Sequence, residues 1–361
     1  MRINSVYFLI LDRFKRLIKP KVPIFQILFF KLIKKNNSVT ELNYLDSRYF
    51  ITRLLDKTIN NHLTSFEITS KNGTRLSHSF RNRYVVELSE VIVNTKNLDV
   101  FAIDKKLKSH LILDSTEWSQ LPRTNVPDIR DLHGLDSKAS LGFPSANYFH
   151  KITEYLPRVI KLASIYSHPF IFNSRLSNID LELIKTLKID FYQFPNFVKV
   201  NKLNMLSMEN DLGYMHPDDL KLLKRFSNEI VPACNANKRI YLSRRYSRRS
   251  DINEKLLELM LINQGFAVVY AEQLTFLQQV QLFKSAATIV GIHGSGLVNL
   301  IWSESANLIE LMPITRINRC FEWIAGLNNS KYARIDFNPK NYNLETIFRQ
   351  ICELIPRIKN S

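Results

Sequence analysis

Strands alternate with helices throughout the second half of the chain, and this alternation limits the fold more than any other feature of the sequence. Strands are expected over Arg239–Ser243, Phe266–Tyr270, Ala287–Gly291 and Asn307–Met312, and helices over Asn253–Gln264 and Thr275–Ala286. Gly265 is expected to end the first helix and Thr275 to cap the second. Such an alternation produces βαβ units and a parallel sheet, so the fold class is α/β.

A glycine-rich turn lies between the third strand and a short helix that begins at Leu297. The chain has only nine glycines, and three of them, Gly291, Gly294 and Gly296, lie within six residues. In open α/β sheets, ligands bind beyond the carboxyl ends of the strands, where a helix N-terminus attracts phosphate. The turn from His293 to Gly296 is therefore a candidate anion site, and the alternative is an ordinary tight connection. Its spacing matches neither the Walker pattern nor GxGxxG.

Four arginines follow the first strand, at the same edge of the sheet as the glycine turn. They are Arg244, Arg245, Arg248 and Arg249, with Asn253 at the start of the next helix. A guanidinium group matches the oxygens of a phosphate. A solvated basic loop or a non-specific nucleic-acid patch is the alternative, but convergence with the glycine turn favours a diphosphate clamp.

Glu310 lies at the end of the fourth strand. A carboxylate at this edge of a sheet accepts hydrogen bonds from ribose hydroxyls in dinucleotide folds. A helix cap or an ion pair explains it equally well, so both interpretations stay open.

The first half of the chain mixes short strands and helices and is expected to form a separate domain. Strands are expected over Tyr84–Leu88, Glu90–Val93, Val100–Ile103, His110–Leu113, Phe170–Phe172 and Ile189–Phe194, and helices over Tyr148–Tyr166, Ile179–Leu187 and Pro217–Phe226. The domain boundary is placed in the segment Val231–Lys238. The resulting division is a basic segment 1–40, a first domain 41–230, a second domain 231–340, and a C-terminal part 341–361 whose helix is expected to pack back on the first domain.

His150 and Glu154 share one face of the helix expected at 148–166, because residues four apart are neighbours on a helix. Such a pair supplies a general base in one interpretation and a surface ion pair in the other. The pattern is not HExxH and lacks a third ligand, so a zinc site is not expected. The three cysteines, Cys234, Cys320 and Cys352, form no CxxC motif, which excludes a disulfide scaffold.

Positive charge is concentrated at the N-terminus. The chain has 50 Lys+Arg against 33 Asp+Glu, a net charge of +17. Residues 1–35 hold nine Lys/Arg and one acidic residue, interleaved with apolar stretches that are too short to span a membrane. No signal-peptide cleavage site follows them. The segment is expected either to lie on an anionic membrane surface or to pack on the protein's own core.

Together these stretches resemble the family 61 glycosyltransferases, whose bacterial members include capsular polysaccharide biosynthesis proteins. The resemblance runs from Ser243-Arg244-Arg245 and Asn253-Glu254 through the turn to Ile309-Glu310-Leu311-Met312-Pro313. The family's turn is similar to His-Gly-Ala-Gly-Leu-Thr-Asn, and here Ser295 and Val298 replace the Ala and Thr. In the first domain, Asn147-Tyr148-Phe149-His150, Glu154 and Leu156-Pro157-Arg158 resemble the family's Asn–aromatic–His, acid and Leu-Pro-Arg segment.

The resemblance implies a GT-B fold, in which two Rossmann-like domains face each other across a cleft, and an inverting transfer that uses no metal and no cofactor. The absence of an Asp-x-Asp motif agrees with metal independence. Glu154 is expected to be the catalytic base, with His150 next. The residues expected on the nucleotide-sugar donor are Arg244, Arg248, Arg249, Asn253, His293, Gly294, Ser295, Gly296, Leu297, Asn299 and Glu310.

The expected function is sugar transfer to a glycan or lipid-linked glycan during synthesis of capsule, O-antigen or lipopolysaccharide, at the inner face of the cytoplasmic membrane. Two other classes stay open. One is a basic nucleic-acid-binding protein, although no known nucleic-acid motif is present and about half of the excess charge lies in residues 1–35. The other is an inactive family member that serves as a scaffold.

Overall fold

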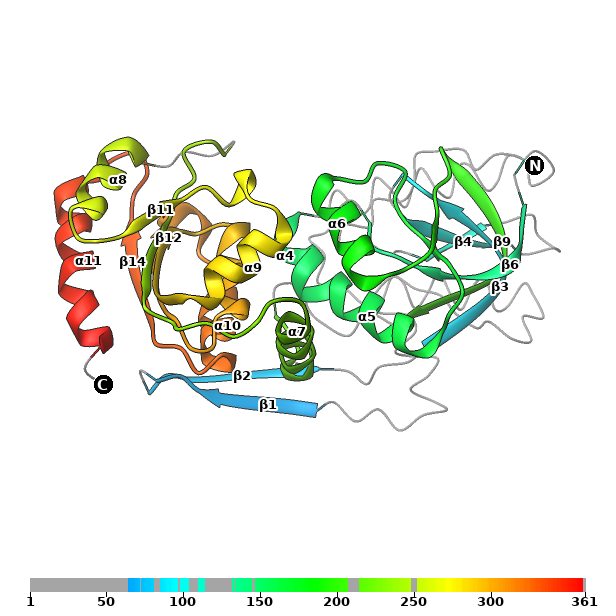
Figure 1. Cartoon of the computed structure of the whole chain (residues 1–361), viewed down its shortest axis with the longest axis horizontal. Helices are drawn as coiled ribbons and strands as arrows, with labels where there is room; N and C mark the ends of the chain where they lie inside the picture. Colours follow the sequence, from blue (N-terminus) through cyan, green and yellow to red (C-terminus); the bar gives the residue numbers. More distant parts are fainter. Residues whose placement is uncertain are drawn as a thin grey trace, which may run out of the picture.

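The computed structural model describes residues 64–71, 73–80, 85–96, 98–103, 110–113, 132, 134–144, 147–206, 214–247 and 252–359. The basic segment 1–40 lies outside the described residues. Within the described part of the chain, no helix is both long and apolar enough to cross a membrane. The structure contains two large sheets, which lie side by side along the long axis of the molecule (Figure 1).

The second sheet has five parallel strands in the order β11-β10-β12-β13-β14. The strands are β10 (Lys238–Leu242), β11 (Ala267–Val269), β12 (Ala286–Ile292), β13 (Asn307–Pro313) and β14 (Tyr332–Phe337). The helices between and after them are α8 (Glu254–Ile262), η3 (Ala271–Gln273), α9 (Phe276–Lys284), η4 (Ser295–Trp302), η5 (Ile314–Arg316), α10 (Cys320–Leu327) and α11 (Leu344–Lys359). The expected parallel α/β arrangement is therefore confirmed.

Local side-chain chemistry sets the ends of these helices. Thr275 caps α9 by accepting from the backbone of Gln278, whose side chain in turn accepts from Thr275 N, a capping box. Asn253 caps α8 by accepting from Leu256 N. The chain leaves α8 through Gly265 at φ 77°, a backbone conformation that glycine adopts without steric cost.

The first sheet has seven strands in the order β5-β4-β3-β9-β6-β7-β8. They are β3 (Val85–Asn94), β4 (Asp99–Ile103), β5 (His110–Leu113), β6 (Gly134–Leu141), β7 (Phe170–Ile171), β8 (Phe191–Tyr192) and β9 (Phe197–Leu206). Strands β9, β6, β7 and β8 run parallel to one another, whereas β3, β4 and β5 extend the sheet in antiparallel fashion. The sheet is thus a parallel, Rossmann-like half joined to an antiparallel edge.

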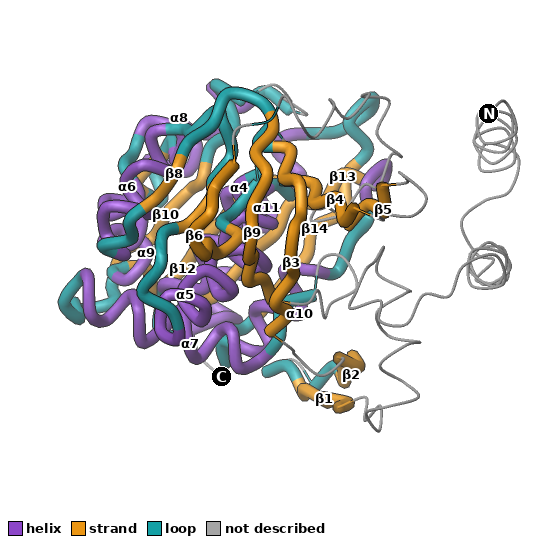
Figure 2. Tube along the Cα trace, turned by 90° about the vertical axis from the view of Figure 1, so that its right-hand side faces the viewer, coloured by secondary structure: helices purple, strands orange, loops and turns teal. Residues whose placement is uncertain are grey.

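The helices of this first half connect its parallel strands and then lead to the second sheet. They are α4 (Tyr148–His150), η2 (Lys151–Tyr155), α5 (Leu156–Ile165), α6 (Asn178–Leu187) and α7 (Pro217–Ile230). We call residues 85–230 the first unit and residues 238–359 the second unit. Figure 2 shows the strands of the first sheet facing the viewer with α5 and α7 below them.

One apolar core passes from the first unit into the second. It joins Phe149, Ile152 and Leu156 to Leu297 and Trp302, all of them buried. The segment α4–η2–α5 therefore lies between the two sheets and contacts η4 of the second unit. A second connection comes from α6, where Glu182 accepts hydrogen bonds from the N–H groups of Phe276 and Leu277 at the start of α9.

The N-terminal hairpin also packs on the second unit. Strands β1 (Thr64–Thr69) and β2 (Arg75–Phe80) pair in antiparallel fashion. Leu76 and Phe80 pack against Trp323 of α10, so this hairpin runs beneath the second unit (Figure 1).

The C-terminal helix packs where the sequence did not place it. Ile347, Ile351 and Ile355 of α11 are buried against the second sheet, and α11 contacts α8, β13 and β14. It lies at the end of the molecule remote from the first sheet (Figure 1). The expectation that it would pack back on the first domain is therefore wrong, because its apolar face completes the core of the second unit.

Candidate active site

The two motifs of the second unit meet at the carboxyl ends of β10 and β12. From β10 the chain passes to β11 on one side, and it then crosses to β12 on the other side of β10. The connections thus diverge between β10 and β12, and ligands of open α/β sheets bind in the crevice at such a point. Arg244 follows β10 and His293 follows β12, and Arg244 Nη1 donates to the carbonyl oxygen of His293 over 2.6 Å.

The three clustered glycines make room for the protein's own side chains. A Cβ atom at Gly294 would lie 3.1 Å from Cζ of Arg244. A Cβ at Gly291 would lie 2.9 Å from Cδ2 of Leu297, and one at Gly296 would lie 3.1 Å from Cδ2 of Leu242. The sequence analysis explained the glycine cluster by the close approach of a phosphate. These contacts explain it instead by close packing of the protein's own side chains. As a result, the Arg244 side chain lies directly on the turn.

The turn opens into η4, a 3₁₀-helix that begins at Ser295. Ser295 is exposed and Gly296 is half-buried. The first N–H groups of a helix have no partner within the helix and face outward along its axis. This helix start and the Arg244 guanidinium therefore give the carboxyl edge of the second sheet two kinds of donor suited to an anion.

Three of the residues expected on the donor, Leu297, Asn299 and Glu310, lie in the core. Leu297 is buried beneath Gly291, and Asn299 has no exposed surface. Asn299 Nδ2 donates to Gln279 Oε1 over 2.8 Å, and Asn299 Oδ1 accepts from Trp302 Nε1 and Tyr148 Oη, each over 2.9 Å. Leu297 and Asn299 support the turn from below, and Asn299 also ties it to the first unit.

Glu310 orients the ring of His293. Its Oε1 lies 2.6 Å from His293 Nδ1, and its Oε2 accepts from Tyr332 Oη over 2.7 Å. The Glu310 side chain is fully buried, whereas His293 is 17% exposed. Burial, together with the charge of Glu310, raises the pKa of Tyr332 above its ordinary value, so Tyr332 remains a hydrogen-bond donor. In the structure Glu310 forms hydrogen bonds with His293 and Tyr332.

A second histidine–carboxylate pair lies in the first unit. His150 Nδ1 is 2.8 Å from Glu154 Oε1, with side chains 19% and 4% exposed. The buried Glu154 Oε2 has no hydrogen-bond partner among the described residues. Both residues lie at a π-helical segment, Lys151–Tyr155, between α4 and α5. Such π-bulges are rare and are frequently found at functional sites.

The two pairs approach each other across the boundary between the units. Aromatic rings connect them in three contacts: His150 to Phe149 at 5.3 Å, Phe149 to Phe321 at 5.5 Å, and Phe321 to His293 at 5.4 Å between centroids. The structure therefore links His150 to His293, more than 80 residues away along the chain, through two buried aromatic rings. Two half-buried histidines, each held by a buried carboxylate, are suited to proton transfer and to hydrogen bonding with a substrate oxygen.

Comparison with known families matches residues 148–309 to the model of Glycosyltransferase 61. The chain carries a glycosyltransferase family 61 domain. No curated protein matches the chain. The matched region runs from the start of α4 into the first residues of β13, and it holds both histidines, Glu154 and Arg244, while Glu310 follows it directly. The domain is that of a glycosyl-transferring enzyme, and it implies a sugar donor and an acceptor as substrates.

Within the family 61 domain, two buried glutamates position the arginine-rich loop, and sequence reasoning missed their role. Ser243 Oγ donates to Glu258 Oε1 over 2.7 Å, and Glu254 accepts from Tyr241 Oη and from Arg244 N. Burial raises the pKa of Glu254 above its ordinary value. The available signal was the spacing of Glu254 and Glu258, four residues apart on a helix that follows the loop.

Several expected donor contacts are not tested by this geometry. Arg248 and Arg249 lie outside the described residues. Asn253 caps α8 through its side chain and donates its N–H to Tyr342 Oη over 2.8 Å. Arg245 is exposed and pairs with Glu258. Arg244 is therefore the arginine that the described structure places on the glycine turn, at the carboxyl edge of the second sheet. Among the residues that the structure describes, no group of three or more His, Cys, Asp or Glu residues is placed to hold a metal ion.

Proposed function

We propose that this protein transfers a sugar from a nucleotide-sugar donor to a glycan acceptor, in a GT-B arrangement with the donor on the second unit and the acceptor on the first. The observation that carries the proposal is the contact of Arg244 with His293 at the carboxyl edge of the second sheet, inside a glycosyltransferase family 61 domain. One histidine–carboxylate pair lies on each unit, and this supports binding of the donor by one unit and of the acceptor by the other.

On the donor side, Arg244 and the start of η4 neutralise the diphosphate. Negative charge develops on the diphosphate as the bond to the sugar breaks, and preorganised donors stabilise that charge without reorganising. Arg248 and Arg249 are proposed to add to this clamp from the same loop. When both of its ring nitrogens carry a proton, His293 donates from Nε2 to a phosphate or sugar oxygen while its Nδ1–H donates to Glu310. This set of positive groups takes the role that a divalent ion has in metal-dependent transferases, so we propose a metal-independent reaction.

On the acceptor side, His150 takes the proton of the attacking hydroxyl, and Glu154 orients its ring and stabilises its charged form. We assign the base to His150 because its side chain is 19% exposed, whereas that of Glu154 is 4% exposed. The hydroxyl oxygen forms a bond to the anomeric carbon as the bond from that carbon to the diphosphate oxygen breaks. The proton goes to His150 and the electron pair leaves with the diphosphate. A single displacement from the opposite face inverts the anomeric configuration.

The cellular setting that we propose is synthesis of a bacterial surface polysaccharide, such as capsule, O-antigen or lipopolysaccharide, on the cytoplasmic side of the membrane. The basic, partly apolar segment 1–35 supports this proposal, because such segments bind anionic lipid surfaces. The acceptor is then a glycan or a lipid-linked glycan.

Thermal unfolding with a panel of UDP, GDP and CMP tests the donor assignment. A ligand that binds only the folded protein raises the melting temperature. At a concentration 100 times its Kd it adds about 2.7 kcal/mol to the free energy of unfolding. We expect one of the three to raise it, and its nucleotide sugar to be turned over at the same rate with and without EDTA. If none of the nucleotides stabilises the protein but an oligonucleotide does, the chain binds nucleic acid and the proposal is wrong.

A further inference from the structure

An exposed aromatic ring lies two residues beyond the arginine that contacts the glycine turn. Ser247 N donates to the carbonyl oxygen of Arg244 over 2.8 Å, so residues 244–247 form a β-turn with Tyr246 near its tip. The Tyr246 side chain is 58% exposed. A ring that the fold leaves open at the carboxyl edge of a parallel sheet is a surface on which a planar ligand can stack.

Two contacts hold the Tyr246 ring in place. Its centroid lies 4.9 Å from that of Tyr270 at an interplanar angle of 65°, which is an edge-to-face arrangement. The Arg245 guanidinium lies over the Tyr246 ring, with Cζ 5.6 Å from the centroid, and pairs with the buried Glu258. The ring is therefore positioned before a ligand arrives, so less side-chain freedom is lost on binding.

The order of the strands places this ring at one end of a row of side chains. Tyr270 follows β11, Arg244 follows β10 and His293 follows β12, and these parallel strands are neighbours in that order. Ser243 N donates to the carbonyl oxygen of Val269 over 3.0 Å, so β10 and β11 stay paired up to their carboxyl ends. Neighbouring strands lie about 4.8 Å apart, so about 10 Å separates β11 from β12. A diphosphate with its ribose spans a comparable distance.

The proposed reaction determines which end of the row faces the sugar. His293 is linked to His150, the proposed base, through two aromatic rings. The anomeric carbon must therefore lie on the His293 side of the diphosphate. The nucleoside is attached at the other end of the diphosphate, so it extends from Arg244 away from His293. That direction leads to the end of β11 and to the Tyr246 ring.

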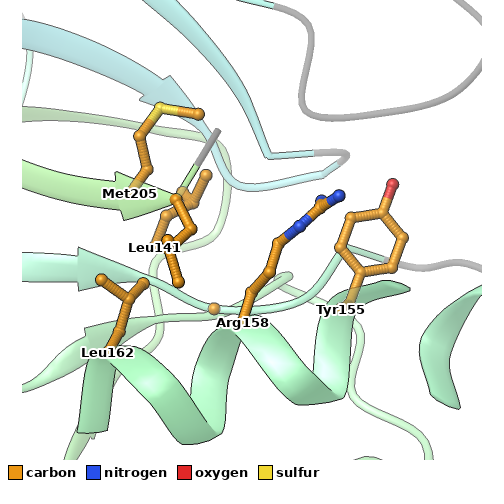
Figure 3. Close-up of a pocket in the computed structure, with 7 residues that line it drawn as sticks. Leu141, Tyr155, Arg158, Leu162 and Met205 are labelled. Carbon is orange, nitrogen blue, oxygen red and sulfur yellow. The ribbon is translucent and has the colours of Figure 1, made fainter. Parts of the chain in front are cut away.

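The corresponding position in the first sheet is too small for a nucleobase. A concavity lies there at the ends of β6 and β9, and Figure 3 shows the side chains of Leu141, Leu162, Met205, Arg158 and Tyr155 around it. Its volume is about 20 Å³, which is room for about one water molecule. The open ring on the second unit therefore suits a planar base better than this concavity does.

We propose that the Tyr246 ring, positioned by Tyr270, is the surface on which the base of the nucleotide donor stacks. The inference rests on the proposed function, because that function places a nucleotide sugar on the second unit. Stacking on an aromatic ring tolerates any base, since every base has a π-face. Tyr246 thus adds affinity for the nucleoside without choosing between a purine and a pyrimidine.

Binding of ligands with and without a base tests this proposal. The probes are UDP, GDP and CMP, with inorganic pyrophosphate and phosphate as the base-free matches, measured by calorimetry with the full chain. Tyr246→Leu removes the ring, and we expect it to weaken the nucleotide that the wild type binds best by about tenfold. Affinity for the base-free match should stay at the wild-type value, because Arg244 is unchanged. Tyr246→Phe keeps the ring and should bind that nucleotide as the wild type does.

The matched control is Phe191→Leu, which removes an exposed ring of the first unit and should leave both affinities unchanged. If Tyr246→Leu does not fold, Tyr270→Leu serves instead, because loss of the supporting ring should weaken the nucleotide and leave the base-free match unchanged. An unchanged nucleotide affinity, or an equal loss for the nucleotide and its base-free match, overturns the inference and leaves the transferase proposal intact. A wild-type protein that binds none of the three nucleotides contradicts the proposed function itself, and this inference with it.

Discussion

Tyr148 at the start of α4 donates a hydrogen bond to Asn299 in η4 over 2.9 Å. The two residues are 151 positions apart in the sequence, and their bond joins the first unit to the second. Burial raises the pKa of Tyr148 above its ordinary value, so its hydroxyl stays a donor through the neutral range. Asn299 also binds Gln279 and Trp302 within the second unit. The start of α4 in the first unit and the helix η4 that follows the glycine turn are therefore held in one polar network.

Removing this bond should loosen the contact between the units. Tyr148→Phe keeps the ring and leaves Asn299 Oδ1 with Trp302 as its donor, so we expect a loss of about 0.5–1.5 kcal/mol in the free energy of unfolding. Urea denaturation at neutral pH measures it. Tyr166→Phe is the matched control, since Tyr166 follows the same helix and its ring contacts His168 within the first unit. Equal stabilities of the two variants would show that the bond contributes nothing to the joining of the units.

Much of the second unit could be predicted from the sequence because each local signal agrees with the final packing. The apolar runs are buried strands, and Thr275 and Gly265 end or begin helices through contacts within a few residues of themselves. The first unit was harder. Strand β9 escaped prediction because Val198 and Val200 alternate with polar residues, whereas Leu203–Leu206 is buried on both faces, so no single period covers the strand.

Other features depend on contacts that no local pattern encodes. The π-helical segment at Lys151–Tyr155 could not be predicted, because the spacing of the apolar residues there is that of one continuous helix. Asn299 was expected on the ligand because it follows the glycine turn, but its partners Tyr148 and Gln279 come from distant segments. Spacing alone brought His150 and Glu154 together correctly, since a four-residue separation on a helix needs no tertiary information.

Substitutions in the His150–Glu154 pair of the first unit should lower turnover and leave donor binding unchanged. His150→Gln removes the proposed base, and Glu154→Gln removes the charge that stabilises its protonated form. We expect the first to lower kcat by about 10²–10⁴ and the second also to lower it strongly, while nucleotide affinity stays at the wild-type value. Steady-state kinetics and calorimetry measure these two quantities.

The control for this pair is His168→Gln, which changes a histidine of the same unit that bonds Ser140 and Asn204. It should retain wild-type kcat. If Glu154→Gln abolishes turnover while His150→Gln is fully active, Glu154 itself takes the proton. Full activity of both variants would remove the pair from the mechanism.

Lys224 of α7 should give the stability an alkaline dependence. Burial lowers its pKa from the ordinary 10.5 to about 8, and its ammonium donates to the carbonyl of Ser303 across the boundary between α7 and the second unit. The unfolded chain keeps this proton up to its higher pKa, so between about pH 8 and pH 10.5 the unfolded state binds more protons. Stability contributed by this group therefore rises with pH over that range.

Lys224→Met should remove this rise, and Asn328 Nδ2 would still donate to the Ser303 carbonyl over 3.2 Å. The measurement is the difference in unfolding free energy between wild type and variant at pH 7 and pH 10, which cancels the titration of all other groups. We expect the unfolding free energy of the variant, relative to that of the wild type, to be larger at pH 7 than at pH 10. A difference that does not change with pH would mean that Lys224 titrates alike in the folded and unfolded chain.

Arg244 should determine donor affinity, and its neighbour offers a matched control. Arg244→Ala removes a guanidinium that lies on Gly294 of the glycine turn, whereas Arg245→Ala removes an exposed one that pairs with Glu258. A hydrogen bond to a charged group contributes about 1.5–3 kcal/mol, so we expect Arg244→Ala to weaken binding of the preferred nucleoside diphosphate by tenfold or more in calorimetry. Arg245→Ala should weaken it far less, although it removes the same charge from the same loop. Similar losses in both variants would mean that the loop acts only through its total charge, and unchanged affinity in Arg244→Ala would exclude this arginine from the diphosphate site.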